Sequence, residues 1–553
     1  MDATARPTPS RSSAATVASV VAALLAAVTL TAVHGAVDLQ PVEPSLLASP
    51  AASAPVVAAD VHDAAADGPA AVVVQATPGA VVAARAAVEA AGGEVVLDLE
   101  VVSGFSALVD VAALDALTRV DGVRAVTLDA SVELAHVGPD GDRPDGDTQV
   151  AETVGADVLH AQGIDGEGVG IAIIDTGVAD LPDFAGRRVG MLDLSGDDDH
   201  VDRYGHGTFI AGVAAGNGAS SGGEHAGVAP GAHVVPVKIA GRTGSADISH
   251  VLAAIQYVVT FRDVLDIGVL NLSLGTDSDQ TQLLSPLNHA VERAWDAGIV
   301  VVVSGGNHGE DGPGRIPKPA DDPLVVTVGA TDSMGTVDRA DDHVAGYSSL
   351  GPSIADGFDK PDLVAPGSHL VSLIAPGSQL DTVHTSAHVD AAHAQGSGTS
   401  FAAGVVSGAA ALLRQAHPEW TPDQVKEALT SAAAPGPAGD RNVDGHGALD
   451  VAAALTASPS PDTQGHVVRA TGLGSLEADR GSLHVEVSTS GVFNTLAYLL
   501  GQVSSLTGDT TAQLLSFDPA DYASTDWTRS NWYGSTWYGS NWYGSNWYHD
   551  GWG

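Results

Sequence analysis

Residues 396–408 read GSGTSFAAGVVSG, and this stretch places Ser400 between a glycine-rich turn and the start of an apolar helix. A serine in this position is a candidate nucleophile, and it also fits the role of helix N-cap. The two roles are compatible, because a helix N-terminus favours developing negative charge. A serine hydroxyl is a weak nucleophile at neutral pH, so it needs a base and an acid that orients the base.

Two other segments supply these groups. The stretch VGIAIIDTG, residues 169–177, ends an apolar strand at Asp175, and YGHGTFIAG, residues 204–212, places His206 at the start of a second apolar helix. Taken alone, Asp175 could be a turn residue and His206 a surface residue. With Ser400 they form the chain order Asp, His, Ser, and we expect Asp175 to orient His206 and His206 to act as general base.

Three further blocks join these motifs: VVVSGGNHG at 301–309, YSSLGP at 347–352 and KPDLVAPG at 360–367. Together the blocks resemble the subtilisin-like (subtilase) serine peptidases, whose catalytic residues follow the same chain order. The resemblance implies a serine endopeptidase that works through an acyl-enzyme. It also implies that Asn307 supplies the side-chain donor of the oxyanion hole.

The chain departs from the family pattern at a few positions. Phe209 and Ile210 follow HGT where His and Val are common, and Phe401 follows Ser400 where Met is common. The short loop after the His206 helix lacks the usual calcium-binding asparagine pattern, so the resemblance implies no calcium site there.

The resemblance further implies a cleft whose backbone edges pair with an extended peptide substrate. The edge residues are Thr243, Gly244, Ser245, Ser273, Leu274 and Gly275, and the wall of the specificity pocket consists of Ser304, Gly305 and Gly306. The small side chains of this wall favour a bulky apolar or aromatic residue before the scissile bond.

Composition limits the function classes. The 553 residues include 67 Asp plus Glu against 23 Lys plus Arg, a formal net charge of -44, which argues against nucleic acid as a partner. The chain has no cysteine, so disulfides, thiol chemistry and cysteine-based zinc sites are excluded. We expect a protein or peptide substrate.

Changes in composition along the chain indicate seven segments. They are an export signal (1–36), a linker (37–68), a folded segment (69–135) that the resemblance implies is a propeptide, an acidic linker (136–149), a domain (150–456) that the resemblance implies is catalytic, a C-terminal extension with strands (457–526) and a Trp/Tyr-rich tail (527–553). The signal predicts a secreted, extracellular protein. An uncleaved membrane anchor is the alternative, because the apolar run at 14–33 is long.

Two folded parts are expected. In 150–456, apolar strands alternate with helices, which predicts an α/β domain with a mostly parallel sheet covered on both faces, the three-layer subtilisin-like fold that the resemblance implies. Residues 69–134 alternate as strand, helix, two strands, helix and strand, a small ferredoxin-like α+β unit. Its position resembles that of the subtilase propeptide, which implies a folding aid and temporary inhibitor that lays its last strand in the cleft.

No cofactor or metal site is expected. The acidic run of Asp197, Asp198, Asp199 and Asp202 could bind calcium, but a solvated loop is favoured. Two of the three histidines at 384, 388 and 393 have helical spacing, but they lie in a Gly/Ser-flanked loop, so we expect no metal there.

The tail repeats an aromatic unit. Tryptophan recurs every five residues from Trp527 to Trp552, in repeats such as SNWYG. A period of five matches neither helix nor strand, so the pattern is typical of a flexible chain that contacts a cell surface, a glycan or other copies of itself. A low-complexity end without function is the alternative.

For the whole protein, the alternatives to a broad endopeptidase are an inactive binding scaffold on the same fold and a narrow processing peptidase.

Overall fold

The computed structural model describes residues 56–57, 61, 64–65, 68–129, 131–134, 149–197, 199–460, 464–474, 476–479 and 481. The expected export signal, nearly all of the acidic linker and the Trp/Tyr-rich tail lie outside these residues. Among the described helices, none is both long enough and apolar enough to cross a membrane.

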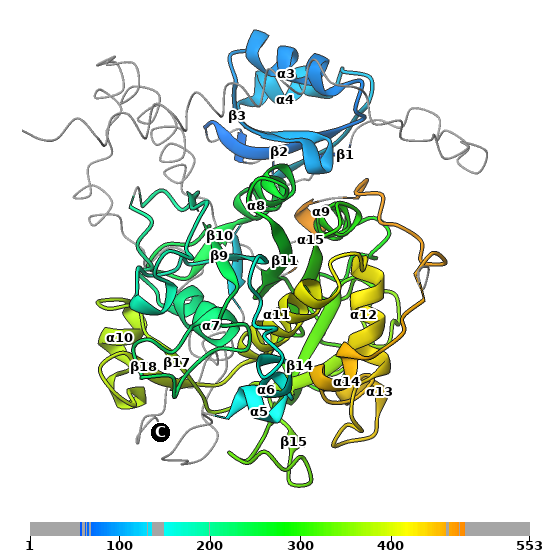
Figure 1. The fold of residues 1–553 in the computed structure, drawn as a ribbon. Helices are drawn as coiled ribbons and strands as arrows, with labels where there is room; N and C mark the ends of the chain where they lie inside the picture. The colour runs from blue at the N-terminus through cyan, green and yellow to red at the C-terminus, as the bar shows by residue number, and fades with distance from the viewer. Residues whose placement is uncertain are drawn as a thin grey trace, which may run out of the picture. The chain divides into compact units, whose positions relative to one another are not determined.

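The N-terminal domain is a five-stranded sheet with two helices on one face (Figure 1). The strand order is β1-β5-β2-β4-β3, in which β1 and β5 are parallel and the other pairs are antiparallel. The elements are β1 (Val56–Val57), β2 (Ala70–Ala76), α3 (Val81–Ala90), β3 (Glu94–Leu99), a 3-10 helix (Glu100–Val102), β4 (Gly104–Val109), α4 (Val111–Leu117) and β5 (Val123–Leu128). From β2 to β5 this is the expected ferredoxin-like arrangement.

Two details of this domain differ from the sequence-based expectation. Val56–Val57 belongs to the segment expected to be a linker, yet it adds a fifth strand beside β5. The single last strand expected over 124–134 is divided into β5 and β6 (Ser131–Leu134). Asp129 lies between them, where its carboxylate accepts a hydrogen bond from the backbone N–H of Ser249 at 3.0 Å.

The main sheet of the second domain has eight strands and is almost entirely parallel, as predicted. Its order is β15-β14-β13-β11-β7-β9-β8, with β16 also paired to β14, and only β14 and β15 are antiparallel. The strands are β7 (Gly170–Asp175), β8 (Leu192–Asp193), β9 (His233–Lys238), β11 (Ile267–Leu272), β13 (Val300–Ser304), β14 (Val326–Asp332), β15 (His343–Val344) and β16 (Leu363–Pro366). Every residue of β7, β11 and β13 is buried, because helices cover both faces.

Helices α7 and α11 pack against each other in one layer, and α8 and α9 form a second layer. The helices of this domain are α5 (Val150–Thr153), α6 (Ala156–His160), α7 (His206–Ala215), α8 (Ile248–Phe261), α9 (Pro286–Asp296), α10 (Gln379–Val383), α11 (Thr399–Ala416), α12 (Pro422–Ser431), α13 (Arg441–Asp444) and α14 (Val451–Leu455). Shorter 3-10 turns occupy Pro182–Phe184, Gly309–Asp311 and Thr385–Ala387. The three layers confirm the predicted fold class.

Glycine allows α11 to approach α7 closely. A Cβ atom at Gly408 would lie 2.9 Å from the carbonyl oxygen of Ala214 in α7 and 2.7 Å from the Cβ of Val228. Any larger residue would therefore push the two helices apart. At the other end of this contact, the ring of Phe401 near the start of α11 lies 5.7 Å from that of His206, the first residue of α7. The two helices therefore bring the segments of Ser400 and His206 together.

Two smaller sheets flank the main one. Strand β6 lies between β10 (Ser245–Asp247) and β12 (Leu274–Gly275) and is antiparallel to both. Strands β17 (Leu370–Leu373) and β18 (His393–Gly396) form an antiparallel pair just before α11.

The C-terminal extension differs from the expectation. Strands were predicted there, but within its described residues, 457–460, 464–474, 476–479 and 481, the structure has the short helix α15 (Leu476–Asp479) and no strand. The buried carboxylate of Asp479 accepts hydrogen bonds from the hydroxyl of Ser285 at 2.8 Å and the backbone N–H of Leu287 at 2.9 Å. These hydrogen bonds hold the described part of the extension against the first turn of α9. The contact is made by a side chain and not by a paired strand.

Candidate active site

Asp175 and His206 form a buried pair at the carboxyl end of the central strand. Asp175 is the last residue of β7 and His206 the first residue of α7, and neither side chain is exposed. The Nδ1 atom of His206 lies 2.9 Å from each carboxylate oxygen of Asp175. Asp175 also accepts a hydrogen bond from the backbone N–H of Thr176 at 2.7 Å, so its carboxylate is fixed from two sides.

Local contacts explain why His206 is followed by glycine and threonine. A Cβ atom at Gly207 would lie 2.2 Å from the carbonyl oxygen of Gly177, so only glycine fits there. The buried carboxylate of Asp202 accepts hydrogen bonds from the backbone N–H and the hydroxyl of Thr208 at 2.9 and 2.6 Å. Burial raises the pKa of Asp202, and these hydrogen bonds partly offset that effect.

The acidic run therefore has a structural role that the sequence-based reading did not assign. Asp202 anchors the first turn of α7, which carries His206. Asp197 lies 2.6 Å from the ammonium of Lys238, and Asp199 pairs with the guanidinium of Arg203. Asp198 lies outside the described residues. The run was expected to be a solvated loop, but these carboxylates face cations and backbone donors.

Ser400 lies in the first turn of α11 and is fully buried. The helix begins at Thr399 and its N-cap residue is Gly398, so the predicted N-cap role of Ser400 is wrong. The reason is that the extended backbone at Gly398, with φ 162° and ψ 150°, already ends the preceding turn. Ser400 is thus the second helical residue, where backbone N–H groups point out of the helix end.

A buried polar chain links Ser400 to the sheet, and the sequence-based reading missed it. The hydroxyl of Ser273 donates to the carbonyl oxygen of Ser400 at 3.2 Å and accepts from the side-chain amide of Asn271 at 2.9 Å. Asn271 in turn accepts from the hydroxyl of Ser407 at 2.9 Å. The sequence does contain a sign of this chain, because Asn271 and Ser273 are polar residues within the otherwise apolar stretch VLNLSL.

The side-chain amide of Asn307 is held in one orientation by hydrogen bonds to its oxygen, which leaves its nitrogen available as a donor. The Oδ1 atom of Asn307 accepts from the backbone N–H of Thr399 at 3.0 Å and from its hydroxyl at 2.8 Å. Two donors on one oxygen define which end of the amide is nitrogen. The Nδ2 atom is buried and has no hydrogen-bond partner among the described residues. This donor lies beside the turn that carries Ser400.

The two phenylalanines that depart from the family pattern contact each other. The ring centroids of Phe209 and Phe401 are 4.2 Å apart, and the ring of Phe401 lies 5.7 Å from that of His206. Both phenylalanines are fully buried. The two phenylalanines that depart from the family pattern therefore pack against each other, and Phe401 also packs beside the His206 imidazole.

The expected cleft edges are already paired with a strand of the N-terminal domain. Ser245 is opposite Glu133 in β6, and Leu274 and Gly275 are opposite Leu134 and Glu133. Thr243 and Gly244 form the turn before β10, and Ser273 directly precedes β12. Extended backbone thus fills the space between the two edges.

The expected pocket wall follows β13. Ser304 ends this strand, the backbone N–H of Gly305 donates to Val328 at 2.8 Å, and Gly306 adopts a φ of +93°. This left-handed conformation favours glycine, and it turns the chain toward Asn307. All three wall residues are buried.

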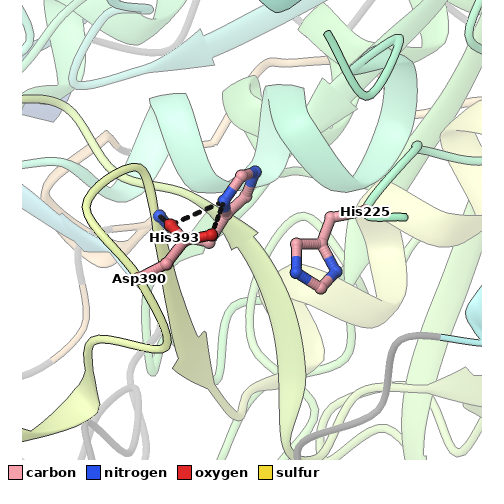
Figure 2. A group of neighbouring side chains, drawn as sticks. All are labelled: His225, Asp390 and His393. Carbon is pink, nitrogen blue, oxygen red and sulfur yellow. Dashed lines mark hydrogen bonds and ion pairs between the residues drawn. The ribbon is translucent and has the colours of Figure 1, made fainter. Parts of the chain in front are cut away.

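One group in the described part of the chain could hold a metal ion, namely His225, Asp390 and His393 (Figure 2). The sequence-based reading considered His393 only with His384 and His388. The partner His225 comes from a distant loop, which sequence spacing does not reveal.

Comparison with known proteins identifies the class of protein. The model of the subtilase family matches residues 166–464, more than half of the chain, so the chain belongs to this family of subtilisin-like serine endopeptidases. The serine protease AprX of Bacillus subtilis is 39% identical over 298 residues, which cover 53% of this chain and 67% of that protein. Subtilisin Savinase of Lederbergia lenta is 33% identical over 295 residues, which cover 53% of this chain and 93% of the relative.

A solved structure shows the same fold. Fervidolysin from Fervidobacterium pennivorans, described as a keratinolytic enzyme related to subtilisin, superposes with a TM-score of 0.57 at 24% identity. The match covers 71% of this chain and 61% of that chain.

Proposed function

We propose that the protein is a secreted serine endopeptidase that cleaves peptide bonds through Ser400, His206 and Asp175, and that it is made as a self-inhibited precursor. The observation that carries the catalytic proposal is the buried pair in which both oxygens of Asp175 lie 2.9 Å from Nδ1 of His206. This pair holds the imidazole in the tautomer whose Nε2 can take a proton.

The reaction follows from these groups. The Oγ atom of Ser400 attacks the scissile carbonyl carbon while Nε2 of His206 takes the hydroxyl proton. Asp175 stabilises the imidazolium through Nδ1–H, and the oxyanion accepts hydrogen bonds from Nδ2 of Asn307 and the backbone N–H of Ser400. His206 then protonates the leaving amine, and water hydrolyses the acyl-enzyme by the same route. No step of this mechanism requires a cofactor.

The precursor proposal is supported by β6. This strand occupies the space between β10 and β12, where a substrate would form the same antiparallel hydrogen bonds. Residues 56–134 would therefore act as an inhibitory propeptide. Cleavage in the acidic linker 136–149 would release the enzyme, and the N-terminal apolar segment would direct its export.

The tail proposal rests on sequence alone. Six tryptophans at five-residue intervals in 527–553 would anchor the enzyme to a cell surface, a glycan or other copies through many weak contacts. Deleting 527–553 should leave hydrolysis of a short soluble peptide unchanged and shift the enzyme into the free medium. Identical partitioning of the two forms would contradict the anchor.

A fluorophosphonate probe and the Ser400→Ala variant test the catalytic proposal. The processed parent should react with the probe and cleave casein, whereas Ser400→Ala should do neither and should accumulate as uncut precursor. An unlabelled, inactive but folded parent would favour the binding scaffold, and activity on a single native protein would favour the processing peptidase.

A further inference from the structure

Three side chains converge outside the Asp175, His206 and Ser400 site. His225 lies in the loop that follows α7, Asp390 lies just before β18, and His393 is the first residue of β18 (Figure 2). One potential ligand atom from each residue lies within 4.8 Å of the other two, and the two imidazole centroids are 4.6 Å apart. We call these residues the His225 cluster.

Asp390 and His393 are already held in a fixed geometry. The Nδ1 atom of His393 lies 2.9 and 3.0 Å from the two carboxylate oxygens of Asp390. The same carboxylate accepts hydrogen bonds from the backbone N–H groups of Ala392 and His393 at 2.7 and 2.8 Å. Local hydrogen bonds therefore set the orientation of this carboxylate.

The two imidazoles are incompletely satisfied. The His393 side chain is fully buried, and its Nε2 atom has no hydrogen-bond partner among the described residues. The same is true of the buried Nδ1 atom of His225. A buried nitrogen without a partner costs free energy, so the unpaired Nδ1 atom of His225 indicates a place that gains from a ligand. The Nδ1 atom of His393, beside Asp390, is the nitrogen of that ring that faces the same place.

We propose that the His225 cluster binds a Zn²⁺ ion through His225, Asp390 and His393, with water in the fourth position. Two imidazole nitrogens and one carboxylate oxygen suit Zn²⁺, whereas Ca²⁺ and Mg²⁺ prefer sites made of oxygen atoms. Bonds of about 2.0–2.2 Å place tetrahedral ligands roughly 3.3 Å apart. The Nδ1 atom of His393 and the carboxylate of Asp390 are 2.9 Å apart, close to this spacing, and Nδ1 would release its proton when the ion binds. The ligand atom of His225 lies within 4.8 Å of theirs and has to move closer.

The position of the site suggests what the ion does. His225 follows α7, which begins with His206, and β18 leads through Gly396 to Ser400. A bound ion would fasten the loop after α7 to this strand and so hold the two catalytic segments together. It would also stabilise the native state, and this stabilisation would grow with the logarithm of the metal concentration above the Kd. The Asp390 side chain is 46% exposed, which leaves a path for the ion.

The test uses full-length Ser400→Ala protein without a histidine tag, so that binding is measured independently of activity and autolysis. Equilibrium dialysis against Zn²⁺ should show a site that is lost in His225→Ala and in Asp390→Asn. The affinity should fall by more than the ~10–100-fold typical of a change that only affects a ligand's hydrogen-bond partner. Zn²⁺ should raise the Tm of the parent, and Co²⁺ should give the visible absorption of a tetrahedral site.

His388→Ala is the matched control, because His388 lies in the same loop and pairs with Asp381 at 3.3 Å outside the cluster. It should bind Zn²⁺ like the parent. Equal affinity in the parent and in His225→Ala would overturn the proposal, as would a loss in His388→Ala or a preference for Ca²⁺. If His225→Ala fails to fold without metal, His225→Gln provides the same comparison, and unchanged Zn²⁺ binding in it would also overturn the site.

Discussion

The side-chain oxygen of Asn307 accepts both the backbone N–H and the hydroxyl of Thr399, at 3.0 and 2.8 Å. Thr399 is the residue before Ser400, so the proposed amide donor and the proposed nucleophile are held by the same turn. The proposed oxyanion hole is thus built before any substrate binds, which is the condition for strong electrostatic catalysis.

Replacing Asn307 by Ala should lower kcat by about 10²–10³-fold with little change in KM, the effect of losing one oxyanion-hole donor in subtilisin. Thr399→Val should lower kcat by no more than about tenfold, because one of the two hydrogen bonds that orient the amide remains. Steady-state hydrolysis of a short peptide measures both effects. Thr430→Val in α12 is the control and should be neutral. A change confined to KM would remove Asn307 from the oxyanion hole.

The contact between Asp129 and Ser249 predicts a pH dependence. Burial, and then the nearby charge of Asp247, raise the pKa of Asp129 from 3.8 to about 7. A raised pKa means that the bound domain holds the proton more tightly than the free domain. Association is therefore strongest below about pH 4 and weakens as the pH rises to about 7, by at most roughly tenfold per pH unit.

The measurement is the Kd of isolated residues 56–134 for the catalytic domain carrying Ser400→Ala, taken across this pH range. Asp129→Asn should flatten the profile, because the amide oxygen can still accept from Ser249. Asp110→Asn is the control, since Asp110 caps α4 and accepts from Ala113 within its own domain. A steep profile that persists in Asp129→Asn would show that another group is responsible.

The position of β6 predicts which part of the N-terminal domain inhibits. Residues 56–134 added in trans should inhibit the processed enzyme and speed its refolding, because β6 can occupy the space between β10 and β12. Residues 56–129 lack β6 and should lose most of the inhibition while keeping their own sheet. Initial rates of peptide hydrolysis at increasing inhibitor concentration measure this. Equal inhibition by both fragments would place the inhibitory contact elsewhere.

The Phe209 and Phe401 pair should matter for stability. Phe209→Ala in the Ser400→Ala background should lower the free energy of unfolding by about 3–5 kcal/mol, because it leaves a cavity in a fully buried site. Phe358→Ala, at a partly exposed position, should cost clearly less. Denaturant unfolding followed by fluorescence provides both values. Similar costs at the two positions would contradict the packing argument.

Long apolar runs allowed much of the fold to be predicted. GIAIID forms β7, which ends at Asp175 as predicted, and its six residues are all buried between two helical layers. The helix start at His206 was also predicted. The N-cap assignment of Ser400 failed, since the extended conformation of Gly398 depends on its contact with Gly367 rather than on local sequence.

Contacts between distant segments could not be predicted. The Asn271, Ser273 and Ser407 chain depends on α11 lying against β11, and the meeting of His225 with His393 depends on how two loops fold. In the described part of the C-terminal extension, the contact with α9 could not be predicted, because its anchor is a single buried carboxylate, Asp479, which has no periodic pattern around it.

The pairing of β6 with two edges at once predicts which proteins can be cut if substrates take the place of β6, as proposed above. A substrate that replaces β6 must present several consecutive residues in extended form with their backbone groups free. In a folded target those groups are usually engaged in helices or sheets, so cleavage there first requires local unfolding. The rate on native proteins should therefore follow the opening free energy of individual segments, and residue type next to the cut should matter less. The local stability of the target protein would then determine selectivity as much as the specificity pocket of the enzyme does.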